Sequence, residues 1–502
     1  MISKEIKFLL THSSIYGLGT IVSQLVAFLM LPIYTRYLTP KDYGVLELIN
    51  ITTGIVGIVV TIGIARALSR FYYEFNDIKD QNRVVSTTYI TYASIALCCV
   101  LFLLSLTDYF ANIILDSGVY SYYFKITFIN LVLGGLIDIG LMYLRIIKKP
   151  FIFISITISR LIMLISLNIV FIVFLKKGVL GIFYSTLITR IIYSSLITIS
   201  ILWKTRLQYS FILSIDMLKF SLPLIPATLF NTLINQSDKY FIRYFFTIAD
   251  TGIYSLARKL GNTIHLLLTM PFITAYMPRR FEIMKKADAK LIYAKVFKYS
   301  IALSVFVGLA ISILVPEILV LMTTPEFYAA GKYVPLIVFS MIIFAFRYHF
   351  EFGIMWSKKT KYYAYINFFT AIFNLLVNII LIPKYGLWGG VWSSVIVLTV
   401  HSFITYFVSN KLYPIDYEFN SVFKLFLIAI LFYFISLFIN TQNLVLNCAI
   451  KSMMVIIFPF ATILLKVFSH QELEKLKDIL DNISVKYIFL KRPIHIVTSL
   501  IK

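Results

Sequence analysis

The chain has 502 residues, of which 60% are hydrophobic and only 14% are charged, and its mean hydropathy is +0.87. Soluble domains carry about 25% charged residues, so this composition excludes an ordinary soluble enzyme or binding module and predicts an all-α polytopic membrane protein. The formal net charge of +23 comes from short basic clusters between apolar runs, which indicates signals for membrane orientation and no nucleic-acid partner.

About fourteen apolar runs follow one another along the chain, each long enough for a membrane-spanning helix of about 20 residues. The first run follows the charged residues Lys4, Glu5 and Lys7, and no small-residue cleavage site comes after it. We therefore interpret it as a retained span and not as a cleaved signal peptide. The runs cover approximately residues 12–35, 43–65, 84–107, 122–147, 151–175, 178–203, 216–246, 250–277, 292–322, 332–356, 361–382, 387–410, 422–440 and 443–467.

Alternate loops between these runs differ in charge. One set of loops holds most of the basic residues, and the richest of them extends from Arg279 to Lys290. The positive-inside rule places this set, and both termini, in the cytoplasm. Beyond the last run, Ser469 and Glu472 form a capping-box pattern that is followed by leucines at helical spacing. This pattern predicts an amphipathic helix on the cytoplasmic surface.

The chain resembles itself at an offset of about 207–210 residues. The stretch Asp42–Val45 matches Asp250–Ile253, and Asn168 matches Asn378 at the same place in the pattern of spans. An offset of six spans preserves orientation, so the repeats are parallel, an arrangement typical of transporters with a site between two lobes. We therefore predict a first six-helix lobe (1–208), a second six-helix lobe (209–414), two additional transmembrane helices (415–468) and a cytoplasmic tail (469–502).

Several arginines lie inside the apolar runs, where a charged side chain costs about 2.5–3.5 kcal/mol on insertion scales and usually faces a cavity or a partner. Arg160 and Arg190 lie near the middle of their spans without an acidic residue nearby on the same helix. The other candidates for a cationic cavity are Arg36, Arg258 and Arg347. Since the planar guanidinium makes bidentate bonds to phosphate, this excess of arginine predicts an anionic substrate.

Acidic residues are fewer at this depth. Asp138 corresponds to Arg347 at about the repeat offset, so these opposite charges could form an ion pair across the cleft between the lobes. Arg347 and Glu351 are four residues apart and could instead neutralise each other. Asp238 and Lys239 are expected to form a local, partly exposed pair.

Motifs for bound cofactors and for catalysis are missing from the sequence. The three cysteines lie in apolar runs without the spacing of metal ligands. The sequence contains no glycine-rich phosphate loop, no nucleophile elbow and no zinc-type motif. We therefore predict no metal site, no cofactor, no ATP-driven step and no enzymatic activity.

Two parts of the sequence resemble a known family. The first is the stretch Leu31–Gly44 after the first span, and the second combines Phe220–Pro226 with Ser237–Tyr240 and Gly252–Ala257. On these residues the chain resembles the bacterial polysaccharide-unit flippases, of the O-antigen type. Their superfamily also holds the multidrug and toxic compound extrusion pumps and the lipid II flippases.

The resemblance implies two six-helix bundles in a V that opens alternately to each side of the bacterial inner membrane. It implies an undecaprenyl-diphosphate-linked oligosaccharide as cargo, flipped from the cytoplasmic to the outer leaflet for the synthesis of O-antigen, capsule or exopolysaccharide. Membrane lipid, a polysaccharide polymerase and a chain-length complex are the partners that it suggests. It also makes proton or sodium coupling plausible, with Asp138, Glu47 and Glu351 as candidate carriers.

Three alternatives remain open at this point. An ion-coupled multidrug antiporter of the same superfamily should carry acidic residues at mid-depth, where this chain has more arginine. A membrane polysaccharide polymerase should have a sizeable outer loop, and the loops here are short. A scaffold for a polymer-assembly complex would use the cytoplasmic tail.

Overall fold

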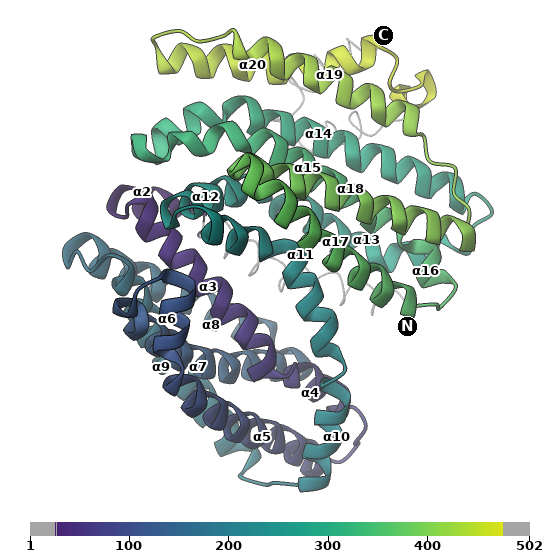
Figure 1. The fold of residues 1–502 in the computed structure, drawn as a ribbon. Helices are drawn as coiled ribbons and strands as arrows, with labels where there is room; N and C mark the ends of the chain where they lie inside the picture. Colours follow the sequence, from purple (N-terminus) through teal and green to yellow (C-terminus); the bar gives the residue numbers. More distant parts are fainter. Residues whose placement is uncertain (1–25, 27, 475–502) are drawn as a thin grey trace.

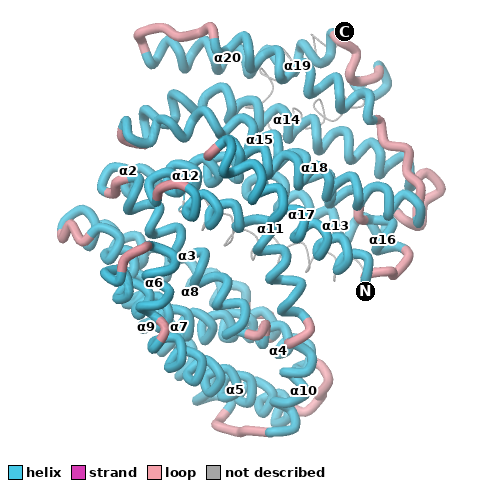
Figure 2. The backbone as a smooth tube through the Cα atoms, in the orientation of Figure 1, coloured by secondary structure: helices cyan, strands magenta, loops and turns pink. Residues whose placement is uncertain are grey.

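The computed structural model describes residues 26 and 28–474, and all its regular elements within these ranges are helices (Figure 2). A first bundle comprises α2 (Leu31–Tyr37), α3 (Pro40–Thr61), α4 (Ile64–Tyr72), α5 (Ile78–Ser105), α6 (Thr107–Leu115), the 3-10 helix η1 (Gly118–Tyr120), α7 (Ser121–Ile146), α8 (Pro150–Ile169), the π-helix η2 (Val170–Phe174) and α9 (Gly178–Thr205). Two helices, α10 (Phe211–Ser221) and α11 (Leu224–Phe245), connect it to a second bundle.

The second bundle comprises α12 (Ile248–Ile264), the π-helix η3 (His265–Thr269), α13 (Met270–Ile283), α14 (Ala289–Met322), the 3-10 helix η4 (Pro325–Tyr333), α15 (Val334–Phe350), α16 (Phe352–Trp356), α17 (Lys361–Tyr385) and α18 (Leu387–Leu412). Two further helices, α19 (Phe419–Leu437) and α20 (Leu444–Leu464), pack against α14. The two bundles meet at the left of Figure 1 and diverge toward the right, which gives the V shape. The predicted all-α fold with two lobes and two additional helices is confirmed.

Each bundle has its own apolar core. The core of the first is built around fully buried aromatic side chains such as Tyr89 and Phe124, and the core of the second around Phe297 and Phe327. The connecting helix α10 packs on α4 and α5 of the first bundle, whereas α11 packs on α17 of the second. The α10–α11 connection therefore links two bundles that are each packed around a separate core.

Twelve helical segments within the described residues are long and apolar enough to cross a membrane, and they coincide with twelve of the predicted runs. The chain is thus a multi-pass membrane protein. The run at 12–35 lies mostly outside the described residues. The run at 250–277 is helical, as α12, η3 and α13, but does not qualify as a span by composition. The reason is that one face of it carries polar side chains, which line the cavity described below.

Breaks in the long helices fall where the backbone chemistry requires them. α10 ends at Ser221 and α11 begins at Leu224, so the break falls at Pro223, which lacks an N–H for the helical ladder. α3 ends where Ile62 and Gly63 take left-handed φ values of 50° and 66°. In the second bundle, the corresponding helix changes to π-helical bonding at His265.

The two repeats begin their second span in the same way. A capping box joins Thr39 to Asp42 at the start of α3, and another joins Thr247 to Asp250 at the start of α12. Each threonine side chain accepts a hydrogen bond from the aspartate backbone, and each carboxylate accepts one from the threonine backbone. The matching residues of the two repeats therefore form the same structure here, a capping box that starts a helix.

The same two helices cross through a matched pair of glycines. Gly44 of α3 lies against the backbone carbonyl of Ile248, and Gly252 of α12 lies against that of Pro40. A Cβ atom at either glycine would come within 2.0 Å of the carbonyl oxygen, a distance that no side chain permits. We call this crossing, formed by Pro40–Gly44 and Ile248–Gly252, the glycine seal, and the end of the molecule that contains it the closed end.

Further contacts hold the bundles together at the closed end. The Thr35 hydroxyl donates to the carbonyl of Met322 at 2.8 Å, and the Arg36 guanidinium donates to that of Leu321 at 3.3 Å. These bonds join α2 to the end of α14. Arg36 thus serves the contact between the bundles in this conformation.

The predicted orientation can be tested with reporter fusions at Asp116 and Lys204. Asp116 lies at the closed end, where its carboxylate pairs with Arg243. Lys204 lies in the last turn of α9, whose first residue, Gly178, adjoins Leu38 at the closed end. We expect a phosphatase fusion to be active at Asp116 and a fluorescent-protein fusion to fluoresce at Lys204. The reverse result at both sites would contradict cytoplasmic termini.

The predicted tail is described only as far as Glu474. Its capping box is present: the backbone N–H of Ser469 donates to the Glu472 carboxylate at 2.9 Å, and the backbone N–H of Glu472 donates to the Ser469 hydroxyl at 3.4 Å. Glu472 also pairs with Lys298 of α14 at 2.8 Å. The expected amphipathic helix beyond this point lies outside the described residues.

Candidate functional site: a cationic cavity beside the closed end

A cavity of about 490 Å³ lies between α3 of the first bundle and α11, α12, η3, α13 and α15 on the side of the second. Within the part of the chain that the structure describes, Glu47 of α3 is the only lining residue from the first bundle. On α12, the lining residues Ser255, Arg258, Lys259 and Asn262 recur at helical spacing and so form one polar face. The polar side chains that make α12 too polar for an ordinary membrane span therefore line this cavity.

A second polar face comes from α11. Asn231, Asn235 and Lys239 are four residues apart and line the cavity together with Gln236. On the opposite wall, α15 contributes Arg347 beside two aromatic rings. Amide side chains both donate and accept hydrogen bonds, so this lining suits a polar ligand with several oxygen atoms.

Two of the four basic residues in the cavity are held by acids. Lys239 pairs with Glu47 at 3.2 Å, which joins α11 to α3 of the first bundle. Arg258 lies 3.6 Å from the Asp238 carboxylate, and its guanidinium also donates to the Asn235 carbonyl at 3.0 Å. Asp238 and Lys239 were expected to pair locally and stay partly exposed. Instead both are buried, and each pairs with a different helix.

The other two basic residues, Lys259 and Arg347, have no ion-pair partner within 4 Å in the described part of the chain. The Arg347 guanidinium lies over the rings of Phe344 and Tyr348, at 5.0 and 5.1 Å from their centroids. The Lys259 ammonium lies 5.8 Å from the centroid of the Tyr43 ring. Aromatic faces stabilise a cation without neutralising it, so these two charges remain available to a ligand.

Four buried polar atoms in the cavity lining also find no hydrogen-bond partner among the described residues. They belong to Gln236 (Oε1), Ser255 (Oγ), His265 (Nδ1) and Arg347 (Nε). Buried polar groups are almost always hydrogen-bonded in proteins. Such a group of unsatisfied atoms around one space therefore indicates a place for water or a polar ligand.

A separate charged cluster lies within the first bundle, where Asp138 of α7 is within electrostatic reach of Arg160 of α8 and Arg190 of α9. Arg190 donates to the carbonyl of Asn130, one turn from Gly134, against which its guanidinium packs. Asp138 is exposed, and both arginines are partly exposed. None of the three lines the 490 Å³ cavity.

The ion pair predicted between Asp138 and Arg347 is not formed in this conformation. The charged neighbours of Asp138 all belong to the first bundle. Glu351, the other suggested partner of Arg347, makes its ion pair with the fully buried Arg280, at 3.7 Å. Arg280 also donates to the carbonyl of Tyr348, so the role of this pair is to hold α13 against α15.

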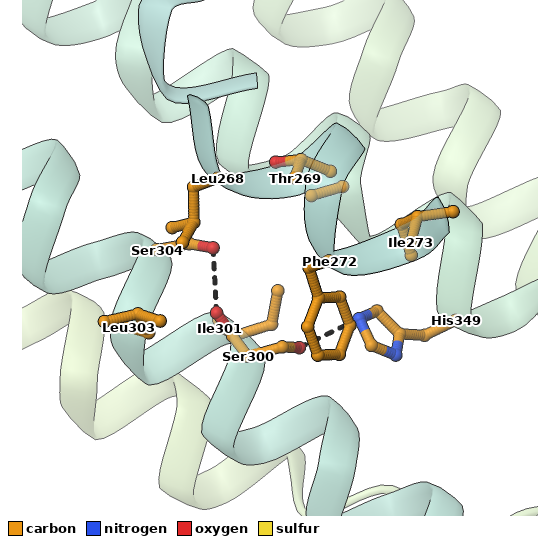
Figure 3. Close-up of a pocket in the computed structure, with 10 residues that line it drawn as sticks. Leu268, Thr269, Phe272, Ile273, Ser300, Ile301, Leu303, Ser304 and His349 are labelled. Atoms are coloured by element: carbon orange, nitrogen blue, oxygen red, sulfur yellow. Dashed lines mark hydrogen bonds between the residues drawn. The ribbon is translucent and has the colours of Figure 1, made fainter. Parts of the chain in front are cut away.

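His349, a neighbour of Arg347 in sequence, points away from the cavity. Figure 3 shows it between η3–α13 and α14, where its Nε2 lies 2.8 Å from the Ser300 hydroxyl. The space that it lines measures about 20 Å³, enough for one water molecule. His349 therefore belongs to the helix packing and not to a substrate site.

The structure thus separates the predicted site residues into three groups. Glu47, Arg258 and Arg347 are brought together around the cavity. Asp138, Arg160 and Arg190 form the cluster in the first bundle, and Arg36 and Glu351 make structural contacts elsewhere. The polar cavity residues that were not predicted from the sequence include Asn231, Asn235, Gln236, Lys239, Ser255, Lys259 and Asn262. The repeated polar spacing within an apolar run was the signal for them.

The Glu47–Lys239 pair gives a test of the contact between the bundles. Neutralising one partner, as in Glu47→Gln or Lys239→Gln, leaves a poorly hydrated charge and should cost about 3 kcal/mol. We expect a lower Tm and weaker closure at the closed end, both recovered by the double exchange Glu47→Lys with Lys239→Glu.

The exposed Arg70–Glu74 pair, at 3.4 Å, is the matched control, since exposed pairs contribute about 1 kcal/mol or less. If neutralising Glu74 lowered the Tm as much as neutralising Glu47, or if the double exchange recovered nothing, the pair would have no special role.

The arrangement of two bundles around a polar cavity has known structural relatives. The lipid II flippase MurJ, in an inward closed conformation, has a TM-score of 0.68 and 14% sequence identity, over 90% of this chain and 98% of that one. An inward-facing multidrug resistance MATE family transporter of the MOP superfamily has a TM-score of 0.62 and 15% identity, over 77% of this chain and 94% of its own. The MATE transporter VcmN of Vibrio cholerae has a TM-score of 0.56 and 14% identity, over 82% and 97%. The fold is therefore the one that MurJ shares with the MATE transporters.

The family follows from the sequence. The family described as "Polysaccharide biosynthesis protein" matches residues 9–284, more than half of the chain. A comparison with curated proteins found no match. The chain belongs to the polysaccharide biosynthesis protein family, which confirms the resemblance drawn from the residues around Leu31–Gly44 and Phe220–Pro226.

Proposed function

We propose that the protein is a flippase that moves oligosaccharide units linked to undecaprenyl diphosphate from the cytoplasmic to the outer leaflet of the bacterial inner membrane. The units serve the synthesis of a surface polysaccharide such as O-antigen, capsule or exopolysaccharide. The protein works by alternating access: the two lobes, residues 1–208 and 209–414, rock about the closed end while residues 415–468 stay attached to the second lobe. Both termini face the cytoplasm in this proposal.

One observation carries the proposal: the charge of the cavity lining. Among the described lining residues, four basic ones, Lys239, Arg258, Lys259 and Arg347, stand against one acid, Glu47. Asp238 neutralises Arg258 from outside the lining, and the remaining excess is still positive. A cavity of this kind attracts an anion, and among the anions a diphosphate offers many acceptor oxygens to guanidinium and ammonium groups.

The division of labour among these residues follows from their contacts. Arg258 and Lys239 are fixed by acids and set the shape and field of the cavity, whereas Arg347 and Lys259 bind the diphosphate directly. Asn231 and Asn262 hydrogen-bond the first sugar, and the polyprenyl tail remains in the lipid. Glu47 and Asp138 are the acids through which a proton or sodium gradient would act on the bundles.

A deletion strain without a second flippase tests this proposal. We expect lipid-linked repeat units to accumulate in the inner leaflet and surface polysaccharide to fall, with both restored by the wild-type gene. Normal surface polysaccharide in that strain would contradict the proposal. If the strain instead became sensitive to cationic dyes, the protein would be a multidrug antiporter.

A further inference from the structure

A second cavity, of about 560 Å³, lies at the closed end on the far side of α14 from the central site. It is enclosed by α14, α19 and α20, by η4, and by the first turns of α15 and α18. We call it the closed-end pocket. In the proposed orientation it faces the outer side of the membrane, where the cargo would be released.

A buried ion pair forms the floor of this pocket. Glu317 of α14 pairs with Lys451 of α20, and only 4% and 7% of these residues are exposed. One carboxylate oxygen of Glu317, Oε1, accepts from Lys451, while the other, Oε2, has no hydrogen-bond partner in the described part of the protein. A fully satisfied helix–helix ion pair would not leave a buried oxygen free.

The backbone next to Glu317 lacks one helical hydrogen-bond donor. Pro316 precedes it within α14 and has no N–H, so the carbonyl of Ser312, one turn earlier, loses its usual helical partner. Ser312 lines the same pocket. The pocket floor therefore combines the unpartnered Glu317 oxygen, a carbonyl that lacks its usual helical donor and one ammonium group, within an apolar helical surrounding.

Aromatic rings form the rim of the pocket. Trp388 at the start of α18 and Tyr328 of η4 are each 38% exposed although they line a cavity, and Tyr433 of α19 is half-buried across from them. Exposed Asn440 and Lys332 add donors at the edge. Sugar rings are bound in this way, with their C–H faces on aromatic rings and their hydroxyl groups bonded to carboxylate, amide and ammonium groups.

We propose that the closed-end pocket binds one or two sugar rings of a saccharide after the central cavity has released them on this side. This inference rests on the proposed function for the identity of the saccharide. Lys451 neutralises Glu317 and Lys332 adds a further positive charge, so the pocket disfavours a metal ion or an ammonium ligand. Neutral hydroxyl donors satisfy Glu317 and Ser312 without adding charge.

Saturation-transfer NMR on the full chain, purified in a detergent without a sugar headgroup, tests the inference. The probes are soluble lactose, maltotriose and chitobiose, which lack both lipid and phosphate. We expect at least one to bind the wild type, and Trp388→Leu to weaken its binding by about tenfold. Glu317→Gln should weaken it as well, and Trp388→Leu leaves the buried ion pair intact if Glu317→Gln fails to fold. Trp203→Leu, at an 88% exposed tryptophan on α9, is the control and should change nothing.

The possible results separate this inference from the proposed function. Binding of a probe that is lost in Trp388→Leu but kept in Arg347→Gln supports the closed-end pocket, whether or not the protein proves to be a flippase. Absence of binding by all three sugars, or binding that survives Trp388→Leu, overturns the inference even if flipping is intact. Glycerophosphoethanolamine is the probe for a lipid headgroup. If it displaced the sugar and bound more tightly than the sugar, the pocket would be a lipid headgroup site and the inference would be overturned.

Discussion

Replacing Gly252 by alanine is expected to reduce transport by about 10- to 100-fold, because overpacking of about 1–3 kcal/mol would be placed on one conformation only. A Cβ atom at Gly252 would lie 2.0 Å from the carbonyl oxygen of Pro40, and backbone cannot move aside as a flexible side chain can. The two segments of the glycine seal, Pro40–Gly44 and Ile248–Gly252, could then not come into contact. A protein that cannot close at this end cannot alternate, even though its cavity is unchanged. Gly44→Ala should act in the same way through Ile248.

Closure can be followed by oxidative cross-linking of Thr35→Cys with Thr324→Cys in a background without the native cysteines. Thr324 donates to the Thr35 carbonyl at 3.3 Å, so the two positions are adjacent only when this end is closed. Cross-linking should fall in Gly252→Ala together with transport. Gly54→Ala on α3 is the matched control, since a Cβ atom there meets nothing within 4 Å. If Gly54→Ala lost as much cross-linking and transport as Gly252→Ala, the effect would come from placing alanine in a helix and not from the glycine seal.

Neutralising the two free cations of the cavity should also abolish most transport. Arg347→Gln and Lys259→Gln each remove one charge-assisted contact to the diphosphate, worth about 1.5–3 kcal/mol, so each should reduce transport by about 10- to 100-fold. Arg347→Lys keeps the charge without the bidentate fork and should retain partial activity. Neither residue makes an ion pair within the described part of the chain, so neither change leaves an unpaired acid behind.

The rate at which a fluorescent short-chain lipid-linked saccharide crosses the bilayer of proteoliposomes is the readout. Lys384→Gln removes an exposed positive charge outside the cavity and is the control for the change in net charge. If this control slowed transport as much as Lys259→Gln, the effect would come from the net charge of the protein and not from the cavity. If Arg347→Gln transported normally, the diphosphate would not bind through this cavity.

Much of the fold could be predicted from the sequence. Apolar runs of spanning length predicted twelve of the helical segments that are long enough to cross a membrane. The repeat of Asp42–Val45 at Asp250–Ile253 gave two parallel lobes. These features depend on neighbouring residues, since hydrophobic length and a capping box are both local properties.

The composition of the site was predictable only in part. A residue's place in its run indicates its depth, so Arg258 and Arg347 could be chosen as cavity candidates, and both line the 490 Å³ cavity. Which charges pair depends on how helices pack, and Lys239 reaches Glu47 across 192 positions of the chain. The sequence alone could not distinguish such a partner from the adjacent Asp238.

The cavity's uncharged residues were missed for a different reason. Asparagines within an apolar run are inexpensive compared with charges, so Asn231, Asn235 and Asn262 gave a weaker signal than any arginine. Their helical spacing becomes informative only when α11 and α12 are seen to face one space. A search for polar residues at intervals of three and four within spans would have found this face.

Binding of a polyprenyl diphosphate to the purified protein, compared with the neutral polyprenol of the same chain length, tests the cationic cavity most directly. We predict that the diphosphate binds at least about tenfold more tightly than the alcohol, and that the double variant Lys259→Gln with Arg347→Gln loses this preference while still binding the chain itself. Equal affinity for the two lipids in the wild type, or a preference for the diphosphate that survives in the double variant, would contradict the account.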